Sequence, residues 1–366
     1  MSLFLIVIPA LLLLVVLLGI ALLKDRTRAD VPARARTPTT ATGTQRPQKL
    51  PEAAPAVEVP YATEATAHAQ AGCLRLAFGI GHFDPQIGGE HTAVLASVAD
   101  SIEQSVHQRD YFPRRPLLLP KLMQALNDSN STRNDIVRLI LEDPTLAGNV
   151  LQRANSAFYR VSPEPVENIH RAVTLLGTEG LRGLMAAAIL QPVFRTPRGL
   201  FENFATVTWQ QAELTASASQ KCAKISVDVD PFVAQLLGLL RMLANIVLFR
   251  LTMDKYSDSP NVPPRAEAFI TAIQTHRDRM AGLIAGTWEL TDTSMRTLQE
   301  QQDRVSPTKM SPLGRCIYYG ELCGALALLA SRDPGAVEDA PALLQTQGLD
   351  PNMGLALWNW TTQRAT

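Results

Sequence analysis

The residues Phe232-Val-Ala-Gln-Leu-Leu-Gly-Leu-Leu-Arg-Met-Leu-Ala-Asn-Ile-Val-Leu-Phe-Arg-Leu251 form a strongly apolar stretch in the second half of the chain. Leu, Ile, Val, Phe and Met dominate it. A helix that is apolar on nearly every side is buried by its neighbours. The stretch therefore predicts a central helix in the core of the fold.

The segments on both sides of this stretch also read as helices. Ala266–Trp288 and Leu313–Ser331 follow it, and Ala93–Val106 precedes it. Two further apolar stripes have helical spacing: Leu146, Val150, Leu151 and Ala154, and then Ile169, Ala172, Val173 and Leu176. From Cys73 onwards no segment alternates convincingly with period two. Successive helices with short connections predict a compact all-α bundle.

Several of these helices carry signals at their ends. Thr132 followed by Asp135 resembles a capping box, with Asp in place of the usual Glu. Asp143-Pro144 predicts an N-cap followed by the first helical residue. Gly177 predicts the end of one helix. Asp228 and Asp230, which lie two apart just before Pro231, are interpreted as caps of the central helix.

The N-terminal segment Leu3–Leu23 contains 21 residues without a charge. At ~1.5 Å per residue such a helix spans roughly 31 Å, the thickness of a bilayer's hydrocarbon core. A cleaved signal peptide would have a basic start and a shorter apolar run, and a core helix would not need so long a run at the extreme terminus. We therefore expect a permanent transmembrane anchor.

Positive charges lie on one side of this anchor. The five basic residues that follow it are Lys24, Arg26, Arg28, Arg34 and Arg36. Because basic residues favour the cytoplasmic side, we expect the rest of the chain in the cytoplasm. From about Asp30 to Gln70 the sequence is rich in Pro, Ala and Thr and poor in large apolar residues, which predicts a disordered tether.

These features divide the chain into five predicted regions. They are a transmembrane anchor at 1–23, a Pro/Ala/Thr-rich disordered linker at 24–70, an accessory helical segment at 71–112, a main helical domain at 113–310 and a C-terminal helical extension at 311–366.

Composition excludes several classes of function. The 34 basic and 34 acidic residues balance, so no nucleic-acid partner is expected. The four cysteines have no CxxC spacing and are interpreted as small buried hydrophobic residues in a reducing compartment. The six histidines are scattered, and even His82 and His91 lack the cysteines or close histidine pair of a metal site. Phosphate-binding P-loops, dinucleotide fingerprints and GxSxG elbows are absent from the sequence.

Several segments, taken together and in this order, resemble the HDOD domain, a bacterial output domain related to the HD phosphohydrolases. The resemblance covers roughly residues 113–305, and it implies an HD-like helical bundle. The segments that carry it are Leu119-Pro120, Asp143-Pro-Thr-Leu146, Leu151-Gln-Arg-Ala-Asn-Ser-Ala-Phe-Tyr159, Ile169-His-Arg-Ala-Val-Thr-Leu-Leu-Gly177, Trp209, Gly238-Leu-Leu240 and Trp288-Glu-Leu290.

The motif residues of this resemblance have structural interpretations. Asn155 is expected to brace a loop at a helix end, with direct ligand contact as the alternative. Phe158 and Tyr159 are expected to pack, and Trp209 and Trp288 are expected to fill the core. The full set of motif positions, all interpreted as structural, is Asp143, Pro144, Asn155, Ser156, Phe158, Tyr159, Gly177, Trp209 and Trp288.

The resemblance also shows where metal ligands would stand. HD hydrolases use a first His, an adjacent His-Asp pair and a later Asp, because imidazole and carboxylate hold the metals that activate water. The first His is expected just after Trp209, where this chain has Gln210 and Gln211. The His-Asp pair is expected at Arg241 and Met242, and neither residue ligates a hydrolytic metal.

Two further positions of the family pattern depart in the same way. Gln301 and Gln302 stand near the late double-His feature, and Arg277 aligns with another common His position, one residue from His276. We therefore predict that the chain has no catalytic residues, metal or cofactor, and that it is a pseudoenzyme.

Three hypotheses about function follow. The first is a non-enzymatic signalling or scaffold protein at the bacterial inner membrane, whose HDOD domain binds a regulatory partner protein or a small ligand. The second is a metal-dependent HD-type phosphohydrolase with non-standard ligands. The third is a structural adaptor at the membrane that binds no ligand.

Overall fold

The computed structural model describes residues 63–105, 132–141, 144–156, 163–190, 199–337 and 339–365. All regular elements within these residues are helical, which confirms the all-α prediction. The expected anchor at Leu3–Leu23, the linker up to residue 62 and the helix expected at Pro120 lie outside the described residues. The helices are α2 (Thr63–Phe78), α3 (Gly89–Ser105), α5 (Arg133–Leu141), α6 (Pro144–Ala154), α7 (Ile169–Leu190), α8 (Phe204–Ile225), α9 (Pro231–Ser257), α10 (Ala266–Thr287), α11 (Asp292–Gln302), α12 (Pro312–Arg332), α13 (Ala340–Thr346) and α14 (Pro351–Thr362).

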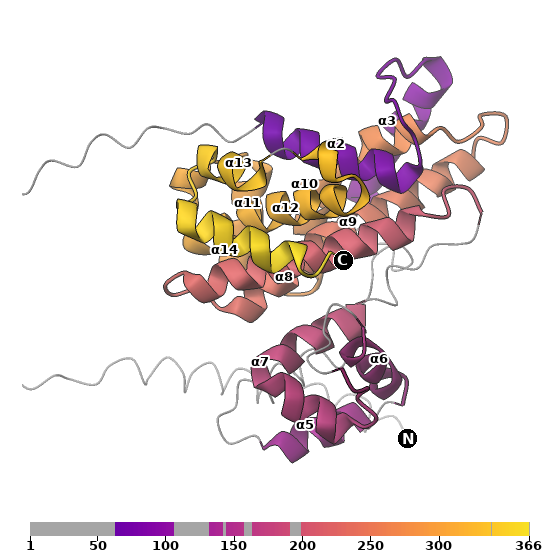
Figure 1. Cartoon of the computed structure of the whole chain (residues 1–366). Helices are drawn as coiled ribbons and strands as arrows, with labels where there is room; N and C mark the ends of the chain where they lie inside the picture. The colour runs from indigo at the N-terminus through magenta and orange to yellow at the C-terminus, as the bar shows by residue number, and fades with distance from the viewer. Residues whose placement is uncertain are drawn as a thin grey trace, which may run out of the picture. The chain divides into compact units, whose positions relative to one another are not determined.

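Helix α9 is the central helix that the opening stretch predicts. It packs against α8 and α10, and it also contacts α3 and α12 (Figure 1). Its start is fixed by Asp230, whose Oδ1 accepts hydrogen bonds from the backbone N–H of Phe232 at 2.7 Å and of Val233 at 3.4 Å. The capping role of Asp230 is confirmed, whereas Asp228 adopts a positive φ of 59° in the preceding loop.

Helices α8 and α12 pack unusually close together. A Cβ atom added to Gly324 of α12 would lie 2.6 Å from the backbone nitrogen of Thr215 on α8. A Cβ added to Gly320 would lie 2.6 Å from the backbone nitrogen of Ser219. Because backbone atoms cannot rotate away as a side chain can, only glycine allows this distance between the two helices.

Helix α2 corrects one predicted boundary. The linker was expected to continue to residue 70, but α2 begins at Thr63. Thr66, Ala69 and Gln70 are buried, and Phe78 at the far end of the helix joins an aromatic cluster in the core. The segment is poor in large apolar residues and so resembles a linker, yet alanine has the highest helix propensity and small side chains allow close packing.

A second, smaller hydrophobic cluster is formed by α5, α6 and α7. Its buried residues include Ile136, Val150 and Val173. The predicted capping box is confirmed, because the backbone N–H of Thr132 donates to Asp135 Oδ2 at 2.9 Å and that of Asp135 donates to Thr132 Oγ1 at 3.3 Å. Helix α7 is broken at Gly177, where φ is 63° and ψ is 179°.

The C-terminal region contributes to the core. α12 is largely buried along α8, and α13 and α14 pack against each other and against α12. The predicted extension at 311–366 therefore begins with a core helix. All four cysteines are buried free thiols, as expected.

Two of the described helices, α9 and α12, are long and apolar enough to cross a bilayer by length and composition alone. In the most apolar 18-residue stretch of each helix, 94% and 83%, respectively, is buried inside the fold. Core helices of globular domains meet the same criterion, so the two helices are weak indicators of a membrane span.

Candidate functional site

The residue Arg241 lies in the middle of α9 and is only 1% exposed. Its Nε lies 2.8 Å from Oε2 of Glu321 on α12, and its Nη2 lies 2.9 Å from Oδ1 of Asp278 on α10. A buried guanidinium needs such partners, because an isolated charge in the protein interior is costly. Arg241 therefore ties three helices together at one point.

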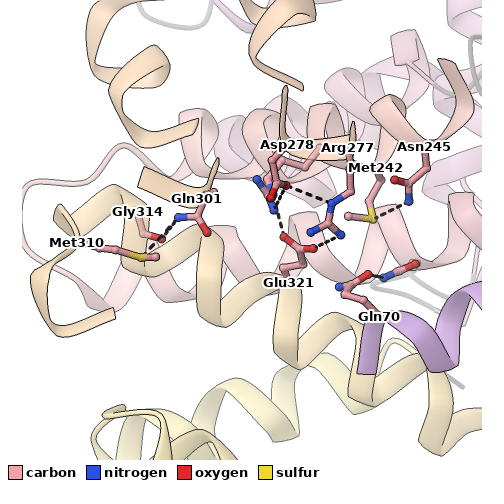
Figure 2. Close-up of polar contacts among 11 residues, drawn as sticks. Gln70, Met242, Asn245, Arg277, Asp278, Gln301, Met310, Gly314 and Glu321 are labelled. Carbon is pink, nitrogen blue, oxygen red and sulfur yellow. Dashed lines mark hydrogen bonds and ion pairs between the residues drawn. The ribbon is translucent and has the colours of Figure 1, made fainter. Parts of the chain in front are cut away.

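A second arginine completes this group. Nη1 of Arg277 lies 2.5 Å from Oε1 of Glu321, and its Nε lies 3.3 Å from Oδ1 of Asp278. Two cations thus face two carboxylates, and the group formed by Arg241, Arg277, Asp278 and Glu321 is neutral as a whole. We call it the arginine–carboxylate cluster (Figure 2).

The electrostatics of the cluster favour the ionised form of Asp278. Burial alone would raise the pKa of Asp278, but the charges of Arg241 and Arg277 outweigh this effect and lower it. A lowered carboxyl pKa means that the folded protein stabilises the charged form. The Asp278 carboxyl is therefore held in its charged form by the two neighbouring arginines.

The other residues that the resemblance aligns with expected ligand positions bond within the fold. Gln211 of α8 donates from Nε2 to Oε1 of Gln70 on α2 at 2.8 Å. Met242 is fully buried, with its sulfur 4.0 Å from Nδ2 of Asn245. Gln301 donates from Nε2 to the carbonyl of Gly314 at 3.0 Å. Figure 2 shows these amides and the cluster in one close-up.

A cavity of about 290 Å³ adjoins the cluster. Two buried polar atoms beside it, Oδ1 of Asn245 and Nε2 of Gln70, have no hydrogen-bond partner within the described part of the chain. Buried polar groups usually have partners, so an open acceptor and an open donor next to a cavity mark a candidate ligand site. The lining residues are Thr66, Ala67, Gln70, Leu74, Asn245, Ile273, Gln274, Arg277, Asp278 and Arg304.

The motif residues that the structure describes make internal contacts. The side chain of Asn155 spans the loop after α6, donating to the carbonyls of Leu151 at 3.0 Å and Val166 at 2.9 Å and accepting from the Val166 N–H at 2.6 Å. Ser156 donates to the carbonyl of Arg153 at 2.7 Å. Pro144 is the first residue of α6, and Asp143, Phe158 and Tyr159 lie outside the described residues.

The two tryptophans of the motif set are buried in different surroundings. Trp288 caps the end of α10 and is 0% exposed in the core. Trp209 is covered by the guanidinium of Arg153, whose Cζ lies 4.6 Å from the ring centroid. Both tryptophans belong to the main hydrophobic core.

The acidic members of the cluster were missed in the sequence, although a signal was present. An arginine inside an apolar helix requires a buried carboxylate, and Glu321 is the only acidic residue between Leu313 and Ser331. His276, which lies one residue before Arg277 and is not predicted as a ligand, is partly buried, and burial lowers its pKa. Within the described residues, no group of three or more His, Cys, Asp or Glu side chains is placed to hold a metal ion.

Comparison with known proteins identifies the domain. The family model for the HDOD domain matches residues 112–304, which is more than half of the chain. The chain belongs to the HDOD domain family. The match ends before α12 and begins after α2, so Glu321 and Gln70 reach the candidate site from outside the HDOD domain.

One curated relative has a sequence similar to this chain. An uncharacterized protein of Treponema pallidum is 26% identical over 254 residues, which cover 65% of this chain and 45% of the relative. The chain thus spans less than half the length of that relative.

Two solved structures share the fold at a TM-score of 0.51. One is an HDOD domain protein of unknown function from Geobacter sulfurreducens, 17% identical, with 74% of this chain and 89% of that chain covered. The other, from Shewanella amazonensis, carries a provisional designation as a metal-dependent phosphohydrolase and is 14% identical, with 75% of this chain and 100% of that chain covered. At these identities the likeness concerns the fold alone.

Proposed function

We propose that this HDOD protein is a non-enzymatic module of signal transduction, which binds a regulatory protein or a small ligand at the bacterial inner membrane. The observation that carries the proposal is the arginine–carboxylate cluster. Its central residue, Arg241, stands where the resemblance to the HD hydrolases leads us to expect a metal ligand.

A divalent cation does not fit this set of side chains. Asp278 and Glu321 are the only carboxylates of the cluster, and both already face guanidinium groups at 2.5 to 3.3 Å. A metal ion would have to displace two fixed cations from a site that is already neutral. The arginines supply the positive charge that a metal would otherwise bring, so the helices are held together without one.

The binding part of the proposal rests on the cavity beside the cluster. Its open acceptor on Asn245 and open donor on Gln70 suit a small polar ligand that presents a donor and an acceptor. Arg304 and Gln274 are exposed at the rim and could also meet a partner protein. The ligand or partner would contact α2, the helix that follows the expected tether.

The membrane part of the proposal rests on the sequence. The uncharged run Leu3–Leu23 and the five basic residues after it support a single-pass anchor with the HDOD domain in the cytoplasm. Residues 24–62 would then act as the tether. Fractionation of cells that express the full chain, with and without residues 1–23, tests this part separately.

The alternative is a phosphohydrolase with non-standard metal ligands. Elemental analysis of the purified full chain separates the two, with hydrolysis of p-nitrophenyl phosphate and bis(p-nitrophenyl) phosphate measured in added Mn²⁺ or Fe²⁺. We expect substoichiometric metal and background hydrolysis. Stoichiometric Fe, Mn or Mg together with hydrolysis that a chelator abolishes would support the phosphohydrolase hypothesis instead.

A thermal-shift panel of nucleotides and metabolites distinguishes a sensor from a ligand-free adaptor. A ligand that binds the folded state raises the midpoint of unfolding. The control variant is Asn245→Leu, which removes the open acceptor of the cavity. A shift seen in the wild type and lost in the variant supports the site, and no shift across the panel favours the adaptor.

A further inference from the structure

The glycine contacts between α8 and α12 also fix which residues meet along this interface. Gly324 lies against Thr215, and one turn earlier on α12 Gly320 lies against Ser219, one turn later on α8. The two helices therefore run antiparallel in this part of the fold, with their backbones in contact. The next turn in the same direction brings the start of α12 beside the end of α8.

Two cysteines meet at this end of the interface, Cys222 on α8 and Cys316 on α12. Both side chains are buried, and their thiol groups form a hydrogen bond with each other. The Oγ atom of Ser226 lies 3.5 Å from the sulfur of Cys316, and it also donates to the Cys222 carbonyl at 2.8 Å. We call Cys222 and Cys316 the cysteine pair.

The other two cysteines bond differently. The Sγ atom of Cys73 donates to the carbonyl of Ala325 at 3.5 Å, and the Sγ atom of Cys323 donates to Oγ1 of Thr361 at 3.4 Å. Burial raises the pKa of both thiols. Each is therefore kept protonated with an oxygen as its partner, and neither is a nucleophile at neutral pH.

Cys316 differs from these because its sulfur accepts hydrogen bonds. The hydrogen bond from the Cys222 thiol lowers the pKa of Cys316 most, and the Ser226 hydroxyl and the charge of Arg315 add to this against the effect of burial. The pKa of Cys222 is raised, first by the same hydrogen bond. A thiolate is the reactive form of cysteine, so the pair places a nucleophile beside a protonated partner.

We propose that Cys222 and Cys316 are a redox-active pair, which a peroxide converts to a disulfide that fastens α12 to α8. A disulfide requires two Cα atoms about 4.4–6.8 Å apart, and helices come this close only where their backbones nearly touch. Gly320 and Gly324 provide that contact within one and two turns of Cys316. The position of the two thiols at the closest approach of the helices carries the inference.

The reaction balances with hydrogen peroxide as the oxidant. The Cys316 thiolate attacks one oxygen of the peroxide, the O–O bond breaks and hydroxide leaves, which gives a sulfenic acid at Cys316. The Cys222 sulfur then attacks this sulfur, and the S–S bond forms as the S–O bond breaks. The hydroxyl group leaves with the Cys222 proton as water. Two thiols are oxidised and one peroxide is reduced to water, and a small thiol such as glutathione reverses the reaction.

The cysteine pair lies one turn from the surface. Ser226 directly follows α8 and is half-buried, and Val227 after it is 80% exposed. Helix ends open locally at a small cost in free energy. Opening of the last turn of α8 therefore admits a molecule as small as peroxide to the Cys316 sulfur.

A disulfide at this point would link two parts of the chain that the family match separates. Helix α8 lies within the matched residues 112–304, and α12 lies beyond them. Helix α12 also carries Glu321, which pairs with Arg241 and Arg277 in the arginine–carboxylate cluster. Oxidation would therefore hold α12, and with it Glu321, against the HDOD domain. This inference goes beyond the proposed function and depends on neither its ligand nor its anchor.

Oxidation of the reduced full chain with hydrogen peroxide tests the proposal. Free thiols are then blocked with N-ethylmaleimide, and the bond is located by mass spectrometry of proteolytic peptides. We expect one disulfide, between Cys222 and Cys316, which dithiothreitol removes. In Cys222→Ser the sulfenic acid at Cys316 should persist and react with dimedone, whereas Cys316→Ser should give neither product. The matched control is Cys323→Ser, a buried cysteine of the same helix, which should leave the disulfide unchanged.

Thermal unfolding gives a second readout in the wild type. A disulfide that fits the fold restricts the unfolded chain, so the oxidised protein should unfold at a higher temperature than the reduced one. Three outcomes overturn the inference. They are no Cys222–Cys316 bond in the folded protein, a bond that forms only after urea has unfolded the chain, and a bond that lowers the midpoint of unfolding. All three are measured in the wild-type chain, so they do not depend on whether a variant folds.

Discussion

The two arginine groups of this HDOD protein differ in burial and in partners. Arg241 and Arg277 lie inside the fold, and each faces carboxylates of other residues on α10 and α12. Arg332 and Arg364 lie at the edge of a cavity and contact an amide, a carbonyl and an aromatic ring. Arginine side chains are thus held by carboxylates in the interior, and they contact an amide, a carbonyl and an aromatic ring at the cavity edge.

This difference teaches when an arginine needs a counterion. A buried cation without a counterion would destabilise the fold, so the interior group had to be neutral. An exposed cation such as that of Arg332 is solvated and needs no counterion for stability. The comparison predicts large stability effects at the first group and small ones at the second.

Removing Arg241 should give the largest effect. Arg241→Leu leaves Asp278 and Glu321 with one cation between them, and breaking a buried pair costs about 3–5 kcal/mol. We expect the free energy of unfolding, measured by urea denaturation of the full chain, to fall by about that amount.

A double variant tests whether charge balance is the cause. Arg241→Leu with Glu321→Leu leaves Arg277 facing Asp278, a neutral pair, and should recover part of the lost stability. A single variant that loses less than ~1 kcal/mol would contradict the role of the cluster, since ordinary surface substitutions have effects of that size.

The close contact of α8 and α12 should give the next largest effect. Gly324→Ala would place a methyl group against the backbone of Thr215, and such overpacking costs about 1–3 kcal/mol. Because α12 carries both Glu321 and Arg332, its displacement would disturb both arginine groups. The control is Gly282→Ala on α10, where an added Cβ meets nothing within 4 Å and alanine should be neutral or stabilising. Equal stability of the two variants, measured by thermal unfolding, would show that the interface can open at little cost.

The sequence predicted the framework of this fold more fully than its candidate site. The apolar run at 232–251, the caps at Asp230 and Thr132 and the break at Gly177 are local signals, and each appears in the structure. Local signals suffice because a helix and its ends depend on residues within one or two turns.

The candidate site depends on contacts between distant segments. Gln70 meets Gln211 across 141 residues, and Arg241 meets Glu321 across 80. The family pattern could indicate the positions where other residues stand in place of metal ligands. Which carboxylates face those residues depends on how the helices pack. The start of α2 at Thr63 was missed for a related reason, because its small residues reveal burial only when the neighbouring helices are known.

The dependence of stability on pH gives a further comparison. The carboxyl groups of Asp278 and Glu213 should change the free energy of unfolding in opposite directions as the pH rises. The pKa of Asp278 is lowered in the folded protein, so its contribution is present above the unfolded pKa of about 3.9 and is lost as the pH falls through the folded value. The pKa of Glu213 is raised, so its contribution is present at low pH and is lost as the pH rises through the folded value.

Urea denaturation of Asp278→Asn and Glu213→Gln between pH 3 and pH 7 measures this. Relative to Asp278→Asn, the wild type should gain stability as the pH rises, and relative to Glu213→Gln it should lose stability. If the stability difference between wild type and variant changed with pH in the same way for Asp278→Asn and Glu213→Gln, the two carboxyl groups would have similar environments, and this prediction would be wrong.

The smallest stability effect is expected at Arg332, at the exposed end of α12. Arg332→Gln removes an exposed charge that contacts one amide, and exposed substitutions of this kind change the free energy of unfolding by about 0.5 kcal/mol or less. The measurement is the same urea titration, with Arg296→Gln as the matched exposed control. A loss of several kcal/mol would place Arg332 with Arg241 as a structural cation, because only a charge that the fold depends on is costly to remove. Near-equal stability of the two variants would show that the fold does not depend on the charge of Arg332.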